Sequence, residues 1–371
     1  MSASARSAAG QALGRRRWPA RITNARYQPA RRPRPASGLG GVLFGTRRTE
    51  KNTAPPAVIL RCVNDIASQL RSACARVATS ARYVSIDREA IPAYAACLQL
   101  GDPAPPAPDP QTHLSAGAEE VLAAFWLTLD AINFGSGWFP TIRKRAGRSG
   151  YHTVAAGITD RFAAAGPWTA RELTSISARE IADTLGQDPE HELMALFARS
   201  LNDLGGHVAD EHKGHFHPVV KSAGTSALAL AGQLASWDCF ADVSIYDGVE
   251  VPFYKRAQIA AADLEDAGLV HWQDRDGLTM FADNLVPHVL RLDGILSFAP
   301  DLLARIDRGE LIAHGAPEEV EIRACAVHAV ELIVAARSDT CATEVDRVLW
   351  SRGGGPGYKS SPRHRSRCTA Y

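Results

Sequence analysis

Two short runs of the sequence hold the residues whose types and spacing could do chemistry. The first run, residues 253–259, is called the Lys255 run. It places Lys255 beside Arg256 at a predicted strand-to-helix junction, where free backbone amides favour an anion. The second run, residues 280–287, is called the Asp283 run, and it brings a single carboxylate to another predicted helix start. A pair of cations and a lone carboxylate suit a substrate with a phosphate at one end and a developing positive charge at the other.

Each of these residues also has an ordinary structural interpretation. Aspartate is among the preferred N-cap residues, and capping aspartates far outnumber catalytic ones, so Asp283 is also a reasonable cap. Cations at a helix start are mildly disfavoured by the helix dipole, which makes Lys255 and Arg256 informative, because an anion between them would offset that cost. The residues alone leave capping and catalysis open for Asp283.

The two runs resemble those of the queuosine salvage family, the queuosine 5′-phosphate N-glycosylase/hydrolases. The resemblance extends over roughly residues 56–371, and several motifs in the family's order are hard to produce by accident. The further motifs are Leu-Thr-Leu-Asp-Ala-Ile-Asn-Phe-Gly-Ser-Gly-Trp-Phe-Pro at 127–140, the segments 319–325 and 330–333, Leu349-Trp350, and the basic run 363–367 before Tyr371.

The resemblance implies an N-ribosyl hydrolase that releases queuine and ribose 5-phosphate from queuosine 5′-phosphate, with no metal and no organic cofactor. In the family, the aspartate of the phenylalanine-alanine-aspartate run acts at C1′ of the ribose, and Asp283 holds that place after Phe281 and Ala282. A fixed carboxylate would stabilise the oxocarbenium-like centre that forms there. The implied partner is a small-molecule nucleotide, with no direct nucleic-acid contact expected.

A set of substrate-binding residues follows from the same comparison. Lys255 is expected at the phosphate or the ribose, and Arg256 less directly, because adjacent helical residues point about 100° apart. Asp130 and Asn133 lie three residues apart near a predicted helix end and share a face, either as a polar helix end or as a pocket wall. His113 stands at a spacing close to that of the family's pocket histidine. The set is completed by Phe281, Ser351 and Arg352.

The C-terminal region departs from the family pattern. Some members carry Leu-Trp-Asp-Tyr, in which the acid and the ring would face the base, whereas this chain has Leu349-Trp350-Ser351-Arg352 followed by three glycines. The residues that read the base are therefore the least defined part of the implied site.

Composition limits the classes of function. The chain has 371 residues, 46% of them hydrophobic, which is enough for a sizeable core. A formal net charge of +1 excludes a global field that attracts nucleic acid. No apolar run approaches the roughly 18 to 20 residues of a membrane span. Seven cysteines without a Cys-x-x-Cys motif are typical of small buried side chains in a reducing compartment, so a cytoplasmic protein is expected.

The N-terminus differs from the rest of the chain. Residues 1–55 hold eleven arginines, one lysine and a single acid, Glu50. Such a segment is not expected to pack, and it is interpreted as a disordered basic extension, an organelle-targeting peptide or translated sequence upstream of the true start. The alanine- and arginine-rich character of the whole chain favours a disordered extension or translated upstream sequence over a targeting peptide.

Hydrophobic periodicity predicts a mainly α fold, a single helical domain at 56–371 with one small β-hairpin. Asp247-Gly248 between alternating residues 243–246 and 249–253 is the hairpin signal. Ser115 is the expected N-cap of the helix that ends near Asp130. The four histidines of residues 206–219 lack the spacing of a metal site and are expected in a solvated loop. The remaining helices are predicted at 57–74, 91–98, 153–165, 169–173, 178–185, 189–204, 223–236, 255–266, 283–292, 298–308, 317–337 and 341–350.

The sequence alone leaves two other functions open. A base-excision-type glycosylase is one, because mainly helical glycosylases exist, although no basic groove is evident for duplex binding. A non-catalytic RNA-binding adaptor that uses the basic residues 1–55 is the other. Deletion of those residues separates an adaptor from a hydrolase.

Overall fold

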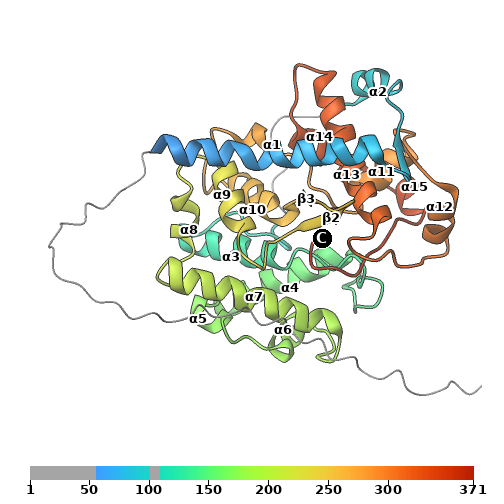
Figure 1. Cartoon of the computed structure of the whole chain (residues 1–371). Coiled ribbons are helices and arrows are strands. Elements are labelled where there is room, and N and C mark those ends of the chain that lie inside the picture. Colours follow the sequence, from blue (N-terminus) through green and yellow to red (C-terminus); the bar gives the residue numbers. More distant parts are fainter. Residues whose placement is uncertain (1–55, 101–108) are drawn as a thin grey trace, which may run out of the picture. The chain divides into compact units, whose positions relative to one another are not determined.

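The computed structural model describes residues 56–100 and 109–371, and of residues 56–65 the backbone alone. Within these ranges the chain forms fifteen α-helices, one 3-10 helix and two two-stranded sheets, which confirms the predicted mainly helical fold (Figure 1). The described residues belong to one compact unit, Ala54–Tyr371. The predictions for residues 1–55 lie outside the described residues.

The helices follow one another with mostly short connections. Their bounds are α1 Pro56–Ser80, α2 Ile91–Cys97, α3 Glu119–Ala131, α4 Gly150–Ala165, α5 Ala170–Leu173, α6 Ala178–Leu185, α7 Glu192–Glu211, α8 His217–Ser222, α9 Ala227–Ala235, α10 Lys255–Asp266, η1 Arg275–Gly277, α11 Val286–Leu292, α12 Pro300–Asp307, α13 Pro317–Ala335, α14 Ala342–Gly353 and α15 Pro356–Lys359.

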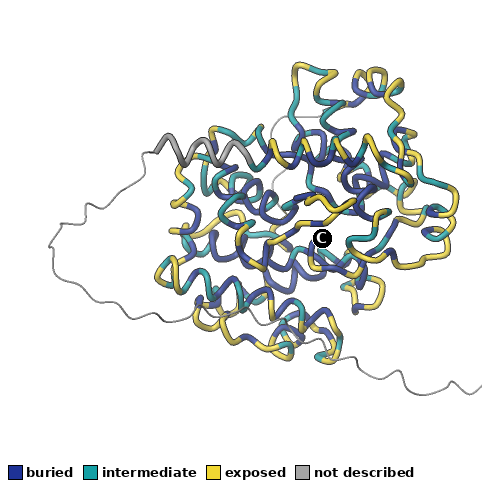
Figure 2. The backbone as a smooth tube through the Cα atoms, viewed as in Figure 1, coloured by how far each residue is buried: buried dark blue, intermediate teal, exposed yellow. Residues whose placement is uncertain are grey.

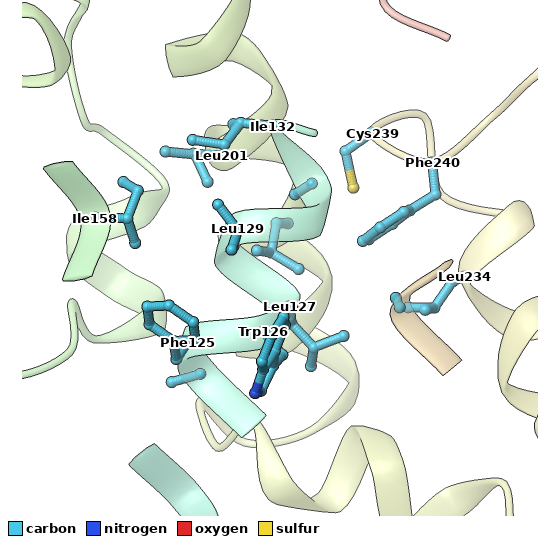
Figure 3. Close-up of a cluster of buried hydrophobic side chains, with 14 of the residues drawn as sticks. Phe125, Trp126, Leu127, Leu129, Ile132, Ile158, Leu201, Leu234, Cys239 and Phe240 are labelled. Atoms are coloured by element: carbon cyan, nitrogen blue, oxygen red, sulfur yellow. The ribbon is translucent and has the colours of Figure 1, made fainter. Parts of the chain in front are cut away.

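Helix α3 runs through the middle of one hydrophobic core. Its residues from 122 to 131 are all buried, as expected of a helix that is apolar on every side. Figure 3 shows Phe125 and Leu129 of α3 among Ile158 of α4, Leu201 of α7 and Phe240. Packing on all sides fixes the C-terminal end of α3, where the predicted site residues Asp130 and Asn133 lie.

Helix α13 is the centre of the second core. Its residues from Val320 to Val330 are almost all buried, and it packs against α1, α2, α11, α14 and the first strand. The buried stretches of both central helices are visible in Figure 2. A 19-residue helix buried along most of its length carries charged side chains only where they are paired, and α13 holds three such residues, Glu319, Glu321 and Arg323.

The hairpin forms as predicted, and a second sheet was missed. Strands β2 (Val243–Tyr246) and β3 (Val249–Pro252) pair across the Asp247-Gly248 turn. Strands β1 (Val84–Ile86) and β4 (Leu296–Phe298) form an antiparallel pair of three residues each. Three residues give too little alternation to stand out in a sequence, and the partners are more than 200 positions apart.

Helix α7 corrects the expectation of a solvated loop at 206–219. The helix continues through Gly205 and Gly206 to Glu211, and α8 follows at His217. A Cβ at Gly205 would meet the carbonyl oxygen of Ala170 and the side chain of Leu173, so glycine allows α5 to approach α7 closely. Tertiary packing therefore outweighs the weak helix propensity of the glycine pair.

The expected cap of α3 is also corrected. Ala118, without a side-chain hydrogen bond, is the N-cap residue of α3, and Ser115 is exposed upstream of it. Glu119 and Glu120 occupy the first turn, where the helix dipole favours acids. The Glu120 carboxylate accepts the backbone N–H groups of Phe216 (2.7 Å) and His217 (2.9 Å) and so anchors the start of α8.

The C-terminal tail, residues 360–371, runs into the interior instead of ending at the periphery. In Figure 1 the C mark lies close to β2, and the final residue, Tyr371, is only 3% exposed. Its backbone oxygen accepts the N–H of Gly135 (3.1 Å), and its ring covers the guanidinium of Arg323 at 4.8 Å. The tail therefore packs against both central helices or the loops that follow them.

Among the described residues, no helix combines the length and apolar character that a membrane crossing requires.

Candidate active site

Asp283 lies in the short segment between η1 and α11 and has one oxygen engaged. Its Oδ1 accepts the backbone N–H groups of Leu285 (2.7 Å) and Val286 (3.2 Å). The N-cap residue of α11 is Leu285, so the helix starts three residues later than predicted, yet Asp283 still supports its first turn. No described residue donates a hydrogen bond to Oδ2, so the carboxylate supports the helix with one oxygen and has the other available for a substrate.

Lys255 is the first residue of α10 and is buried. It follows Tyr254, whose φ of 49° is a strained, left-handed conformation for a residue other than glycine. Its Nζ donates to the backbone oxygen (3.0 Å) and to Oδ1 (3.3 Å) of Asn133. Burial lowers the pKa of Lys255, and Asp283 acts in the opposite direction. The ammonium group therefore lies within electrostatic reach of Asp283 and in direct contact with Asn133.

A buried ion pair connects the Lys255 run to the Asp283 run. Arg323 of α13 donates two hydrogen bonds to Asp242, from Nη1 to Oδ1 (3.0 Å) and from Nη2 to Oδ2 (2.6 Å). Its Nε donates to the carbonyl oxygen of Ala282 (2.9 Å), and Oδ2 of Asp242 accepts the N–H of Lys255 (3.1 Å). One ion pair therefore contacts the backbone of both runs and holds Lys255 and Asp283 in a set relative position.

Asp346 of α14 is a second carboxyl group beside Asp283, and the sequence analysis missed it. It is buried, and its Oδ1 accepts the N–H of Phe281 (3.1 Å), whose carbonyl oxygen accepts the N–H of Asp283 (2.7 Å). Burial, and then the charge of Asp283, raise the pKa of Asp346 well above its usual range. A neutral Asp346 avoids repulsion between two neighbouring carboxylates and holds the backbone two residues before Asp283.

Asp130 and Asp263 form a second pair of carboxyl groups near Lys255. Asp130 is fully buried, and its Oδ1 accepts a 3.4 Å hydrogen bond from Nδ2 of Asn133, while its Oδ2 has no hydrogen-bond partner. Burial raises the pKa of Asp130 against the effects of Asn133 and Lys255; burial and then Asp130 raise the pKa of Asp263. A proton held between the two carboxyl groups would satisfy the unpaired oxygen.

Rings from four segments form a cluster, and one of them, Tyr151, lies near these carboxyl groups. His113 stacks on Trp126 (centroids 5.3 Å apart) and its Nε2 lies 2.9 Å from the Tyr151 hydroxyl. His152 lies between His113 (6.4 Å) and the half-exposed Trp350 (6.3 Å). Burial lowers the pKa of His113 to about 4, so this ring is neutral at physiological pH. The rings offer flat faces of the kind that stack on a purine-like base.

Two of the predicted residues have other partners, and a third is exposed. Arg256 is buried, donates from Nη1 to the carbonyl oxygen of Ala131 (2.6 Å) and lies over the ring of Phe134. Arg352 pairs with Asp293 at 2.7 Å. Ser351 is exposed in the last turns of α14. The structure therefore brings together Asp283, Lys255, Asn133, Asp130 and Phe281, with His113 in the neighbouring ring cluster, but gives Arg256 and Arg352 other partners.

The two acids that the sequence analysis missed, Asp346 and Asp242, shared one weak signal in the sequence. Asp346 stands between Val345 and Leu349, and Asp242 stands before the hairpin, both in apolar surroundings. An acid at a position that the helical period assigns to the buried side is a candidate for pairing or catalysis, but many such acids are only structural.

No group of three or more histidine, cysteine, aspartate or glutamate side chains in the described ranges is arranged to hold a metal ion. His207, one of the four histidines of residues 206–219, stacks on Trp237 at 4.7 Å and contacts Glu211 at 2.6 Å.

Fold and site together define a class: a mainly helical protein whose site combines a carboxylate with a free oxygen, a buried lysine and a second carboxyl group of raised pKa.

Comparison with known proteins identifies the family within that class. Residues 112–371 match the family model described as "Queuosine salvage protein". The chain is 36% identical over 309 residues to the queuosine 5′-phosphate N-glycosylase/hydrolase of Sphaerobacter thermophilus, which covers 80% of this chain and 95% of that protein. It is 29% identical over 282 residues to the protein of the same name from Mus musculus, covering 69% and 83% of the two chains. The chain therefore belongs to the queuosine salvage protein family, and the resemblance seen in its motifs is confirmed.

Proposed function

We propose that this protein hydrolyses the N-glycosidic bond of queuosine 5′-phosphate, releasing queuine for salvage into tRNA together with ribose 5-phosphate. The names of the relatives from Sphaerobacter thermophilus, Mus musculus and Dictyostelium discoideum support the substrate class. The observation that carries the proposal within this chain is the placement of Asp283, which has a free carboxylate oxygen within electrostatic reach of a buried lysine.

In the proposed reaction the bond between C1′ of the ribose and a ring nitrogen of the base breaks, and the electron pair leaves with the base. Positive charge develops at C1′ and the ring oxygen, where the free oxygen of Asp283 would stabilise it and orient the attacking water. The water oxygen bonds to C1′, one of its protons stays on the new hydroxyl group, and the other balances the proton taken up by the base. Asp346, held neutral, keeps the Asp283 segment in place without adding a second negative charge.

The test is incubation of the purified protein with queuosine 5′-phosphate and separation of the products by liquid chromatography. We expect queuine and ribose 5-phosphate from the wild-type protein. Asp283→Asn keeps the volume and the capping ability of the residue, because Asn and Asp cap helices about equally well. It should lower kcat at least about 100-fold, equivalent to roughly 2.7 kcal/mol, while binding persists, since the carboxylate acts on charge that develops at the transition state.

The matched control is Asp301→Asn, which alters an exposed acid in the first turn of α12. It should leave turnover unchanged. A folded Asp283→Asn protein with near-wild-type turnover would leave Asp283 only its role at the start of α11 and remove the catalytic assignment.

We further propose that residues 56–371 are sufficient for this activity and that a small nucleotide, rather than a nucleic acid, is the partner. A protein that lacks residues 1–55 should hydrolyse queuosine 5′-phosphate at the full rate. If neither the full-length nor the shortened protein hydrolyses the nucleotide, and the deletion abolishes binding of an RNA partner, the adaptor function would be favoured instead. The cytoplasmic location inferred from cysteine usage stays a prediction, for which fractionation of the native cells is the check.

A further inference from the structure

The C-terminal tail passes directly beside the Asp283 run. The carbonyl oxygen of Pro362 accepts a hydrogen bond from Nη2 of Arg291 (3.3 Å), and that of His364 accepts one from Nδ2 of Asn284 (3.0 Å). Arg363 lies between these two bonded residues. The backbone that carries Arg363 is therefore attached on both sides to α11 and to the residue that follows Asp283.

Arg363 differs from the other arginines of the tail in having no protein partner. Its side chain is exposed, and no described residue accepts a hydrogen bond from its guanidinium or forms an ion pair with it. Arg365 donates to the carbonyl oxygen of Gly309 (2.9 Å), and Arg367 pairs with Glu192 at 3.6 Å. Of the three tail arginines, Arg363 is the one whose donors are available to a ligand.

The position of Arg363 relative to Asp283 suits a ligand that spans the two. Partial desolvation lowers the pKa of Arg363, and Asp283 acts in the opposite direction, so the two groups lie within electrostatic reach. No described hydrogen bond or ion pair joins the two groups, so each can contact a different end of one ligand. Lys255 and Arg256 cannot take the same role equally well, because both are buried and already donate to backbone oxygens.

We infer that Arg363 binds the 5′-phosphate of the nucleotide substrate and sets the preference for the nucleotide over the free nucleoside. The inference rests on the proposed function, with C1′ at Asp283 and the phosphate across the ribose from it. The planar guanidinium matches the oxygens of a phosphate in a two-pronged hydrogen bond. Its charge also offsets the repulsion between the substrate phosphate and the Asp283 carboxylate. Lys255 then acts on the sugar side, close to the reacting centre.

The first experiment compares kcat/KM for queuosine 5′-phosphate and for queuosine in wild-type, Arg363→Ala, Arg363→Lys and Arg367→Ala proteins. Arg363→Ala should lower kcat/KM for the nucleotide roughly 10- to 100-fold, chiefly through KM, and leave the nucleoside unaffected. Arg363→Lys should recover part of the loss. Arg367→Ala removes the same charge from the same tail and should keep the wild-type selectivity. An unchanged ratio in Arg363→Ala would overturn the inference.

A second measurement separates this inference from the proposed function. Binding of ribose 5-phosphate, with ribose as the control ligand, is followed by calorimetry on the same proteins. Wild type and Arg367→Ala should bind ribose 5-phosphate more tightly than ribose, and Arg363→Ala should lose that difference. A wild-type protein that cleaves nothing would sink the proposed function, whereas equal binding of ribose 5-phosphate by wild type and Arg363→Ala would sink the assignment of Arg363.

Discussion

Two acidic residues at the site, Asp283 and Asp346, each have a structural role and a chemical role. Asp283 supports the first turn of α11 with one oxygen and presents the other, and Asp346 holds the backbone of Phe281 while remaining beside Asp283. The hydrogen bonds that fix these carboxyl groups also decide which of their oxygens are available for chemistry. Preorganisation of this kind is what a transition-state charge requires, because the stabilising group must not reorganise during the reaction.

Replacement of Lys255 tests its role near the reacting centre. Lys255→Ala leaves the backbone oxygen and Oδ1 of Asn133 without their donor and removes a cation beside Asp283. We expect kcat to fall roughly 10- to 100-fold for both queuosine 5′-phosphate and queuosine, with their ratio unchanged. Steady-state kinetics on both substrates measure this, with exposed Lys221→Ala as the control. A loss confined to the nucleotide would instead place Lys255 at the phosphate.

Asp346 is expected to act in its neutral form. As the pH rises through its raised pKa, ionisation adds a second negative charge beside Asp283 and disturbs the site, so activity should fall at the alkaline end. Asp346→Asn keeps a neutral acceptor for the N–H of Phe281 and should retain turnover at neutral pH. The pH profile of kcat is the measurement: the alkaline fall should weaken in Asp346→Asn, and an identical fall in both proteins would assign it to another group.

At the level of elements, the tail contacts segments of both cores. It packs its last residue against Gly135 and Arg323 and passes Asn284, so it touches the loop after α3, helix α13 and the Asp283 run. Each contact is between segments more than 40 residues apart, so none of them can be read from a local stretch of sequence.

Replacement of Gly137 tests how closely the tail must approach the loop after α3. A Cβ at this position would meet the backbone carbonyl of Ser366, which cannot move as a flexible side chain can. Gly137→Ala should therefore destabilise the protein by about 1 to 3 kcal/mol through overpacking. Thermal unfolding checks this, with Gly206→Ala as the control: a Cβ there meets nothing within 4 Å, and alanine in a helix interior is neutral or stabilising. Equal melting temperatures for Gly137→Ala and wild type would show that the tail adjusts freely.

For the whole molecule, a histidine beside a buried carboxylate makes stability depend on pH. Hydrogen bonding to Cys368 of the tail, and then to Glu319 of α13, raises the pKa of His314 to about 10. The unfolded chain loses this proton near the ordinary value of about 6.5. The native state thus holds a proton that the unfolded state has released, and the stabilisation present below pH 6.5 is lost as the pH rises toward 10.

Melting temperatures measured across that window should therefore fall more steeply for the wild type than for His314→Gln, which cannot bind the proton. Below pH 6 the variant should be the less stable of the two. Parallel curves would show that His314 does not contribute to the pH dependence.

The sequence by itself determined the local features of this protein. Periodicity and turn chemistry defined most helices and the hairpin, because these depend on neighbouring residues and on one apolar face. The two runs with chemical groups, and their resemblance to the queuosine salvage family, also lay within contiguous stretches of sequence. Asp283 and Lys255 could be singled out for that reason.

Only the tertiary structure decided which groups meet. Asp346, Asp263, Asp242 and Arg323 come from separate elements, and their local sequence distinguishes a paired buried charge from an exposed one only weakly. The continuation of α7 through Gly205 depends on the close approach of α5, and the availability of Arg363 depends on the path of the tail past Asn284. Burial and pairing arise when distant segments pack together, so the desolvation and contacts that set pKa values and free donors are properties of the folded chain rather than of any stretch of it.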